Sequence, residues 1–278
     1  MALLLALVMA APAGACTLWA AVGSGVAGGG ALAAKNRDWT PDSPGRLELV
    51  RPRGGLAYLA LMAGGRKGWG VRAGVNQAGL TVLSASASAL PKNRRGGPPG
   101  ISRRLLSGFA SVQAVLDQDW MFQGLGPRFY LLADARQIAL VEIAPGGQAR
   151  ITSARQGELA HTNHYQSPDL AGFNQRPALS SHARQAQVEA LLAAAARPLT
   201  LEEFQRLSQD RGAGPDNSLW RTGSRPQGTR TLASFLVRLP LTGSPEVWAV
   251  LANPGQPERR IKIILDENFW QGPTGPLP

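Results

Sequence analysis

The sequence AGACTLWAAV, residues 13–22, contains Cys16, the only cysteine of the 278-residue chain, at the start of a predicted β-strand over residues 17–22. Ahead of it, residues 3–11 are apolar, and Pro12 and three small residues follow, an order typical of a secretory signal peptide. The apolar run is too short to span a bilayer, and no Lys or Arg precedes it. We therefore expect residues 1–15 to be a removed signal peptide and residues 16–278 to form one domain that begins with a free cysteine.

A cysteine at a new N-terminus combines two chemical groups. Its α-amine, with an ordinary pKa of about 8, can accept the proton of its own thiol, so one residue supplies both base and nucleophile. Two other interpretations of Cys16 stay open from this segment alone: a lipidation site on an exported protein, and an inert buried residue. Ala13 weakens the lipid interpretation, because an aliphatic residue such as Leu is usual at that position.

The composition indicates a packed globular protein, with 44% hydrophobic and 17% charged residues. A single cysteine excludes an intramolecular disulfide and a zinc site made of cysteines. The net charge of +11 comes mostly from scattered arginines, which are not interleaved with aromatic residues as in nucleic-acid modules. We interpret the charge as a solvated surface, and we expect no nucleic-acid partner, cofactor or metal.

The pattern along the chain predicts strands, then helices, then strands. Short alternating runs and glycine turns up to residue 84 predict β-hairpins, and residues 91–100 form a Pro/Gly/Arg-rich loop. Helical spacing follows over residues 101–120 and 181–195, and Thr200 caps a helix that extends to about residue 211. The other predicted strands lie at residues 129–134, 137–143, 233–239, 247–252 and 261–265. This order predicts an α+β fold with two antiparallel sheets faced by helices.

Five segments carry a family resemblance: Cys16 after its leader, KNRDW at residues 35–39, GVNQAGL at 74–80, HTNHY at 161–165, and NSLWR at 217–221 followed by TLAS at 231–234. Together they resemble the N-terminal nucleophile (Ntn) hydrolases. Among these, the chain is similar to the acyl-coenzyme A:isopenicillin N acyltransferase group and to the choloylglycine hydrolase and penicillin V acylase family. The resemblance implies a four-layer αββα sandwich with a catalytic cysteine at its first strand.

The resemblance also implies roles for four residues. Cys16 is the nucleophile, Asp38 holds its ammonium group, and Arg221 lies near the thiol, where a fixed cation favours the thiolate. Asn163 is the candidate oxyanion donor, because a side-chain amide offers an N–H without adding a titrating group. The alternatives are a turn or cap for Asp38, a loop role for Asn163 and an exposed surface position for Arg221.

Supporting roles are predicted for five further residues. Either Lys35 or Arg37 takes the place of the family's arginine, and strand alternation puts both on one face with Asp38 on the other. Asn76 is expected to shape a turn, Ser86 to offer its backbone N–H to the oxyanion, and Arg230 to replace Arg221 if the alignment shifts. His161 and His164 flank Asn163, but they make a poor metal-ligand set and are expected to shape the loop.

The expected function is that of an exported amidohydrolase, periplasmic or secreted, which forms an acyl-thioester on Cys16. Its expected partner is a small N-acyl amide such as penicillin V, an N-acyl homoserine lactone, a conjugated bile acid or an acyl amino acid. The alternatives are a Cys16-lipidated envelope protein with a binding role and an acyltransferase with the same nucleophile. Signal peptidase or self-cleavage could expose Cys16, and a homo-oligomer is compatible with the sequence.

Overall fold

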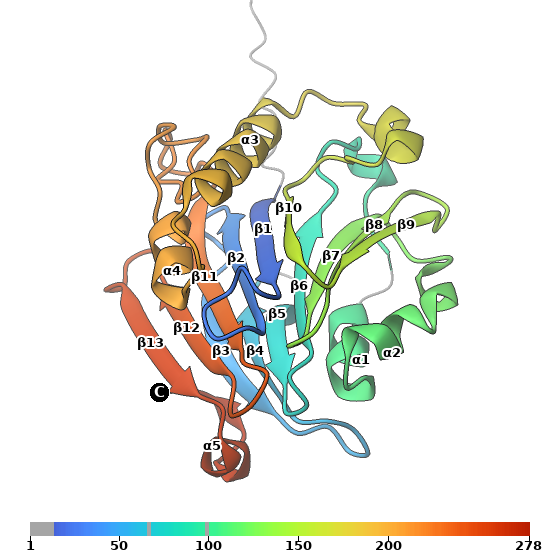
Figure 1. The fold of residues 1–278 in the computed structure, drawn as a ribbon. Coiled ribbons are helices and arrows are strands. Elements are labelled where there is room, and N and C mark those ends of the chain that lie inside the picture. Colours follow the sequence, from blue (N-terminus) through green and yellow to red (C-terminus); the bar gives the residue numbers. More distant parts are fainter. Residues whose placement is uncertain (1–13, 66–67, 98–99) are drawn as a thin grey trace, which may run out of the picture.

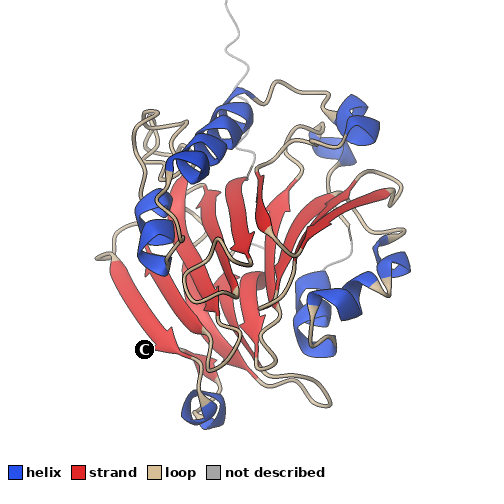
Figure 2. Ribbon diagram, viewed as in Figure 1, coloured by secondary structure: helices blue, strands red, loops and turns tan. Residues whose placement is uncertain are grey.

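Two antiparallel β-sheets face each other, and helices cover their outer faces (Figures 1 and 2). This computed structural model describes residues 14–65, 68–97 and 100–278, so residues 1–13 of the expected signal peptide lie outside the described residues. The predicted α+β class and the four-layer αββα sandwich are confirmed.

The first sheet carries the N-terminal strand in its interior. Among the described residues it has six strands, in the order β10 (Gly157–His161), β1 (Ala15–Val22), β2 (Ala31–Trp39), β11 (Arg230–Leu239), β12 (Glu246–Leu251) and β13 (Arg259–Ile264). Strands β1 and β2 are buried on both faces except at Trp39, as expected for strands that lie between a helical layer and a second sheet.

The second sheet is a meander, in which nearly every strand pairs with its neighbour in sequence. Its order in the described chain is β14 (Gly275–Pro276), β3 (Gly45–Val50), β4 (Tyr58–Ala63), β5 (Gly70–Asn76), β6 (Thr81–Ser86), β7 (Arg128–Ala133), β8 (Ile138–Ile143) and β9 (Ala149–Ala154). Gly79 has a φ of +90° in the β5–β6 turn, a conformation that glycine adopts without strain.

Three layers of core hold the sandwich together. The largest lies between the sheets and includes Cys16, Leu18 and Phe129. A second lies between the first sheet and helices α3 (Leu179–Ala194) and α4 (Leu201–Ser208). A third lies between the second sheet and helices α1 (Ile101–Gly108) and α2 (Val112–Leu116). A short helix α5 (Glu267–Gln271) follows β13, and none of the described helices has the length and apolar character needed to cross a bilayer.

Three sequence predictions are corrected by the structure. The helix predicted over residues 101–120 is two helices, because the chain is extended at Phe109 and Ser111 caps a new helix by accepting a hydrogen bond from the Ala114 N–H. The helix capped by Thr200 ends at Ser208, three residues early. The two strands β9 and β10 were not predicted, although the side chains of β9 alternate between partly buried and exposed over residues 149–152.

The register of β1 on β2 fixes which side chains surround Cys16. Cys16 lies opposite Arg37, Leu18 opposite Lys35, and Ala15 opposite Asp38. Since directly opposed residues of antiparallel strands share a face, Lys35 and Arg37 lie on the face of the Cys16 thiol, toward the second sheet. Asp38 lies on the other face, toward the helices.

Candidate active site

Cys16 is the second residue of β1 and is 6% exposed. Its nitrogen donates a hydrogen bond of 2.7 Å to Asn163 Oδ1. Ala15 precedes Cys16 in the structure, so this nitrogen is a peptide N–H. If residues 1–15 are removed as the sequence predicts, the same atom becomes the α-amine, and the Asn163 side chain already binds it.

Asn163 is fully buried in the connection that follows β10. Its Oδ1 accepts from the Cys16 nitrogen, and its Nδ2 donates to the carbonyl oxygen of Ser86 at 2.9 Å. That carbonyl is the one hydrogen-bond acceptor of Nδ2 within the described residues, and a primary amide carries two N–H groups. The second N–H of Asn163 has no acceptor among the described residues.

Arg184 on α3 contacts both Cys16 and Asn163, and the sequence did not predict it as a site residue. It is 1% exposed. Its guanidinium donates to the Cys16 carbonyl oxygen at 2.7 Å, to Thr17 Oγ1 at 2.9 Å and to Asn163 Oδ1 at 2.9 Å. A charged residue on the buried stripe of a helix, in register with Val188 and Leu192, is the signal that could have found it.

Asp38 lies on the helix side of the sheet and is fully buried. Thr231 Oγ1 donates to its Oδ1 at 2.8 Å, whereas no described group donates to its Oδ2. Burial raises the pKa of Asp38, and the charges of Arg221 and Arg184 with the Thr231 hydrogen bond oppose that rise. Asp38 Oδ2 can therefore accept a hydrogen bond from a further N–H group.

The structure brings Arg221 to this centre but not Arg230. Arg221 Nη1 lies 3.9 Å from Asp38 Oδ2, so its contact is with the carboxylate on the helix side. Arg221 is also tied to Thr231, whose Oγ1 accepts from its N–H at 2.8 Å. Arg230 instead donates to the carbonyl oxygens of Arg225 and Pro226 and shapes that loop.

Lys35 and Arg37 form the cationic side of the thiol pocket. The Lys35 ammonium donates to the carbonyl oxygens of Arg72, at 2.9 Å, and Ser84. Burial lowers the pKa of Lys35 to about 8, and the charge of Cys16 acts in the opposite direction. Arg37 donates to Ser43 at its carbonyl and hydroxyl oxygens, at 2.9 and 2.5 Å. Both predicted alternatives for the family's arginine thus lie on the thiol face.

Ser86 lies in the site, and Asn76 lies away from it. Besides accepting from Asn163, Ser86 donates through its hydroxyl to the carbonyl oxygen of Gly14 at 2.8 Å, two residues before Cys16. The predicted use of its N–H stays a prediction. Asn76 donates to the carbonyl oxygens of Leu106 and Phe109 and accepts from two N–H groups of its turn. It ties the β5–β6 turn to α1.

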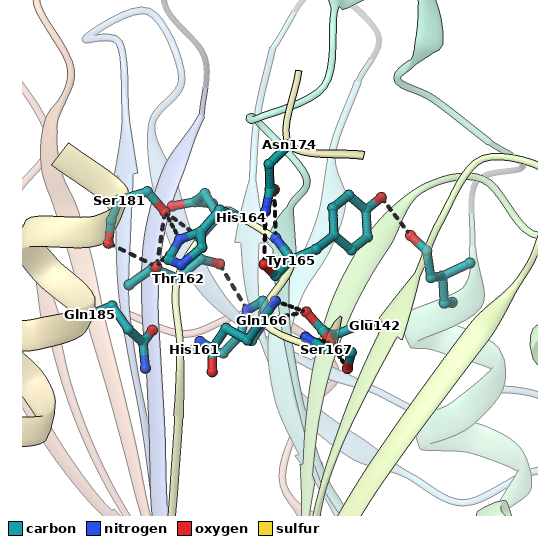
Figure 3. Close-up of polar contacts among 12 residues, drawn as sticks. Glu142, His161, Thr162, His164, Tyr165, Gln166, Ser167, Asn174, Ser181 and Gln185 are labelled. Atoms are coloured by element: carbon teal, nitrogen blue, oxygen red, sulfur yellow. Dashed lines mark hydrogen bonds and ion pairs between the residues drawn. The ribbon is translucent and has the colours of Figure 1, made fainter. Parts of the chain in front are cut away.

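The loop that carries Asn163 is held from both sides (Figure 3). On one side, Glu142 of β8 bonds His161 Nε2 at 2.9 Å and accepts from the N–H groups of Gln166 and Ser167. On the other, Ser181 Oγ accepts from the Asn163 N–H at 2.8 Å and bonds His164 Nδ1 at 2.9 Å. Both histidines therefore act within the loop. The sequence analysis did not find Glu142, whose partners lie far along the chain.

A cavity of about 490 Å³ lies along β5 and β7 next to α1, and the described residues that line it do not include Cys16. Its described lining includes Arg72, whose carbonyl oxygen accepts from Lys35, together with Arg128, Arg103, Tyr130 and Trp69. Arg128 pairs with Ser86 across β6 and β7, which brings the cavity wall next to the acceptor of Asn163. The volume is that of a typical small-molecule site.

The sequence over residues 26–256 matches the family described as acyl-coenzyme A:6-aminopenicillanic acid acyl-transferase. The chain belongs to this family. The match confirms the predicted resemblance to the Ntn hydrolases. Among curated proteins, none is similar enough in sequence to count as a match.

Solved structures with the same fold share little sequence with this chain. A variant and a mutant of conjugated bile acid hydrolase from Clostridium perfringens align with TM-scores of 0.61 and 0.59, each at 12% identity and over 94% of this chain, with 97% and 96% of their own chains covered. An N-acylethanolamine-hydrolyzing acid amidase ortholog from Caenorhabditis elegans aligns with a TM-score of 0.53 at 12% identity, over 80% of this chain and 92% of its own. These likenesses confirm the fold.

Proposed function

We propose that this protein is an exported cysteine amidohydrolase that cleaves the linear C–N bond of N-acyl compounds through an acyl-thioester on Cys16. The observation that carries the proposal is the hydrogen bond from the Cys16 nitrogen to Asn163, in a centre that also holds Asp38, Arg184 and Arg221. Family membership supports it, as do the names of its structural neighbours, a conjugated bile acid hydrolase and an N-acylethanolamine-hydrolyzing amidase.

The chemistry needs one residue for the bond changes. The Cys16 thiol gives its proton to the α-amine as Sγ bonds the amide carbonyl carbon, and the carbonyl oxygen becomes an oxyanion. The ammonium then gives that proton to the leaving nitrogen as the C–N bond breaks, which releases an amine and leaves a thioester. Water, deprotonated by the same α-amine, attacks the thioester carbon, and the acid leaves as the thiol is restored.

The surrounding side chains stabilise the charges that appear in these steps. The free N–H of Asn163 is the donor for the oxyanion, in a site closed from bulk water where such a bond is strong. Asp38 Oδ2, which accepts no hydrogen bond from a described group, is the acceptor for the ammonium that forms on Cys16. On the thiol face, Lys35 and Arg37 place positive charge near the sulfur and favour the thiolate.

We infer from the cavity along β5 and β7 that the substrate carries an anionic group. Three arginines, Arg72, Arg103 and Arg128, line it, and guanidinium groups pair well with carboxylates. An N-acyl glycine should therefore have a higher kcat/KM than the matching, neutral N-acyl glycinamide, with release of the primary amine as the assay. Arg128→Gln should reduce this preference roughly tenfold, as expected for the loss of one charge-assisted contact. An equal loss on both substrates would contradict a role for Arg128 in recognition.

Hydrolysis is favoured over acyl transfer by the leader. A chain exported across the membrane leaves the cytoplasm, where acyl-coenzyme A is found, and water is then the available acceptor. A lipid-anchored protein with a binding role is the competing proposal, because acyl chains on Cys16 would block its amine. The two differ in the mass of the mature protein.

The test is a hydrolysis panel run on protein recovered from its own export route. The panel contains penicillin V, an N-acyl homoserine lactone, a glycine-conjugated bile acid and an N-acyl amino acid, each with the wild type and Cys16→Ser. The proposal predicts a mature chain that starts at Cys16 with no added mass, activity on at least one amide, and a loss of at least about a thousandfold in the serine variant. An acylated or still-leadered Cys16, or full activity in the variant, contradicts it.

A further inference from the structure

Arg184 is a charged side chain enclosed by the fold at a position where most helices carry an apolar residue. It lies on the buried stripe of α3 and is 1% exposed. Enclosing a cation costs free energy unless its donors are used, and here four acceptors take them: the Cys16 carbonyl oxygen, Thr17 Oγ1, Asn163 Oδ1 and, at 3.5 Å, Ser180 Oγ. Two of these four acceptors belong to residues of the proposed catalytic centre, so the inference below rests on the proposed function.

The contact with Asn163 fixes which way its amide faces. A side-chain amide has two orientations that exchange its oxygen and its NH₂ group. The acceptor carbonyl of Ser86 lies on one side, at 2.9 Å from Nδ2, and Arg184 Nη2 lies on the other, at 2.9 Å from Oδ1. The Cys16 nitrogen also faces Oδ1, but a free amine can either donate or accept, whereas a guanidinium only donates. Arg184 is therefore the partner that requires the oxygen at this position throughout the reaction.

A second residue of the same helix holds the backbone of Asn163. Ser181 Oγ accepts from the Asn163 N–H at 2.8 Å. Ser181 and Arg184 are three residues apart, so they lie on one face of α3. One turn of this helix thus forms hydrogen bonds to the backbone and the side chain of Asn163 and to the carbonyl oxygen of Cys16.

We propose that Arg184 is a positioning residue for the Cys16 centre, which holds the Asn163 amide with its oxygen toward the Cys16 nitrogen and keeps a positive charge next to that nitrogen. The same acceptor, Asn163 Oδ1, joins the two groups, so the cation and the future α-amine are neighbours. The acyl-transfer steps do not use Arg184 as an acid, base or nucleophile.

The charge of Arg184 has a direct effect on the base. A neighbouring cation disfavours the ammonium form, so it keeps the α-amine free to accept the thiol proton. Burial lowers the pKa of Arg184 to about 10, and the arginine stays charged at neutral pH. On the same face, the negative charge of Asp38 favours the ammonium form of the α-amine. The positive charge of Arg221, which lies 3.9 Å from Asp38 Oδ2, partly offsets that effect.

Arg184 also acts on His164 of the adjoining loop, whose pKa is lowered to about 4 chiefly by burial. The remaining charged groups near Cys16 lie on the thiol face. They are Lys35 and Arg37 of β2 and Arg72 of β5, and all three are cations. They act chiefly on the sulfur, and they are unchanged when Arg184 is replaced. A shift in the titration of the α-amine on replacing Arg184 is therefore due to Arg184 itself and to the Asp38 charge that it balances.

The experiment compares pH profiles of wild type, Arg184→Gln and Arg184→Lys on the panel amide that the wild type cleaves fastest. Arg206→Gln, which removes a solvent-exposed arginine from the neighbouring helix α4, is the matched control. We expect Arg184→Gln to lower kcat by roughly 10–100-fold with KM nearly unchanged, as for a misplaced oxyanion donor and base. The acid limb of kcat/KM should move about one unit to higher pH, because the ammonium is no longer opposed. Arg184→Lys should keep the limb in place and still lose kcat.

Two results would overturn the proposal. The first is an Arg184→Gln enzyme whose acid limb matches that of the wild type and whose kcat falls only with its folded fraction, measured by circular dichroism. The second applies if the Gln variant does not fold: a folded Arg184→Lys enzyme with wild-type kcat. A wild type inactive on the whole panel, or an active Cys16→Ser, instead removes the proposed function, so the two failures are distinguishable.

Discussion

Cys16 is held through its backbone atoms. Its nitrogen donates to Asn163, and its carbonyl oxygen accepts from Arg184, while its side chain lies in the core between the sheets. The proposed removal of residues 1–15 would leave these side chains in place to orient the new α-amine. The position of the proposed base therefore depends on α3 and on the loop after β10, far from Cys16 in sequence.

Two buried asparagines allow catalysis to be separated from folding. Asn163→Ala removes the proposed oxyanion donor and should lower kcat about 100–1000-fold. Asn76→Ala removes the bonds to the carbonyl oxygens of Leu106 and Phe109 and should lower the melting temperature, with kcat per folded molecule unchanged. Steady-state kinetics and thermal unfolding of both variants test this. An equal effect of the two substitutions on kcat would contradict the assignment of Asn163.

At the residue scale, the sequence predicted the side chains that stand in recognisable motifs. Asp38, Asn163 and Arg221 were named from such segments, and the structure brings them to one centre. Arg184 and Glu142 were missed because neither stands in a motif. Their partners are 168 residues away for Arg184 and Cys16, and 19 for Glu142 and His161, and separations of this kind are set by the fold.

The connection between β10 and α3 is the element on which the site depends most. It carries Asn163 and is joined to the second sheet by Glu142 of β8, which is 2% exposed. Burial by itself would raise the pKa of Glu142, but the hydrogen bond and charge of His161 and the bonds from Ser167 and Gln166 outweigh it and lower the pKa to about 2. This carboxylate is therefore stabilising in its ionised form.

The pH dependence of stability follows from that shift. The ordinary pKa of 4.5 is depressed to about 2 in the folded state, so the contribution of Glu142 is present above pH 4.5 and lost as pH falls toward 2. The shift corresponds to about 3 kcal/mol. Glu142→Gln should be less stable than the wild type by about that amount at pH 7, and the difference should shrink by pH 3. Urea unfolding at both values measures it, and a difference independent of pH would contradict the role of the carboxylate.

At the element scale, apolar patterns predicted the buried strands well and the edges poorly. The helix predicted over residues 101–120 was wrong in its middle, because the apolar spacing continues through the break at Phe109 while the cap at Ser111 starts a new helix. Strands β9 and β10 are the last strands at one edge of each sheet, and all of their residues except His161 are at least partly exposed. Because these strands bury little side-chain surface, their sequences carry only a weak apolar pattern.

The two sheets act as one body through the core between them, and Phe129 lies where that core meets the site loop. It is fully buried, with ring centroids 4.3 Å from His161 and 4.9 Å from Tyr165. Phe129→Ala should cost about 3–5 kcal/mol of unfolding free energy. Trp120→Ala, at a side chain that is 58% exposed, should stay within about 0.5 kcal/mol of the wild type. Denaturant unfolding of both variants measures these changes. Similar losses of unfolding free energy in the two variants would contradict the packing described.

Part of the positive charge of the molecule lies in its interior and not on its surface. Arg37, Arg184 and Arg221 are buried, as is Lys35, and all four surround Cys16 and Asp38. The interpretation of the +11 charge as a solvated surface is therefore corrected in part, because several cations form the interior of the site. The absence of nucleic-acid binding stays a prediction.

The most direct measurement for the account is the mass of the enzyme caught during turnover. Purified mature protein is mixed with its best panel amide, quenched in acid within milliseconds and mapped by peptide mass spectrometry. We expect an N-terminal peptide that begins at Cys16 and carries the mass of the acyl group on that residue. An acyl group on any other residue, or turnover with Cys16 unmodified and the leader in place, would contradict it.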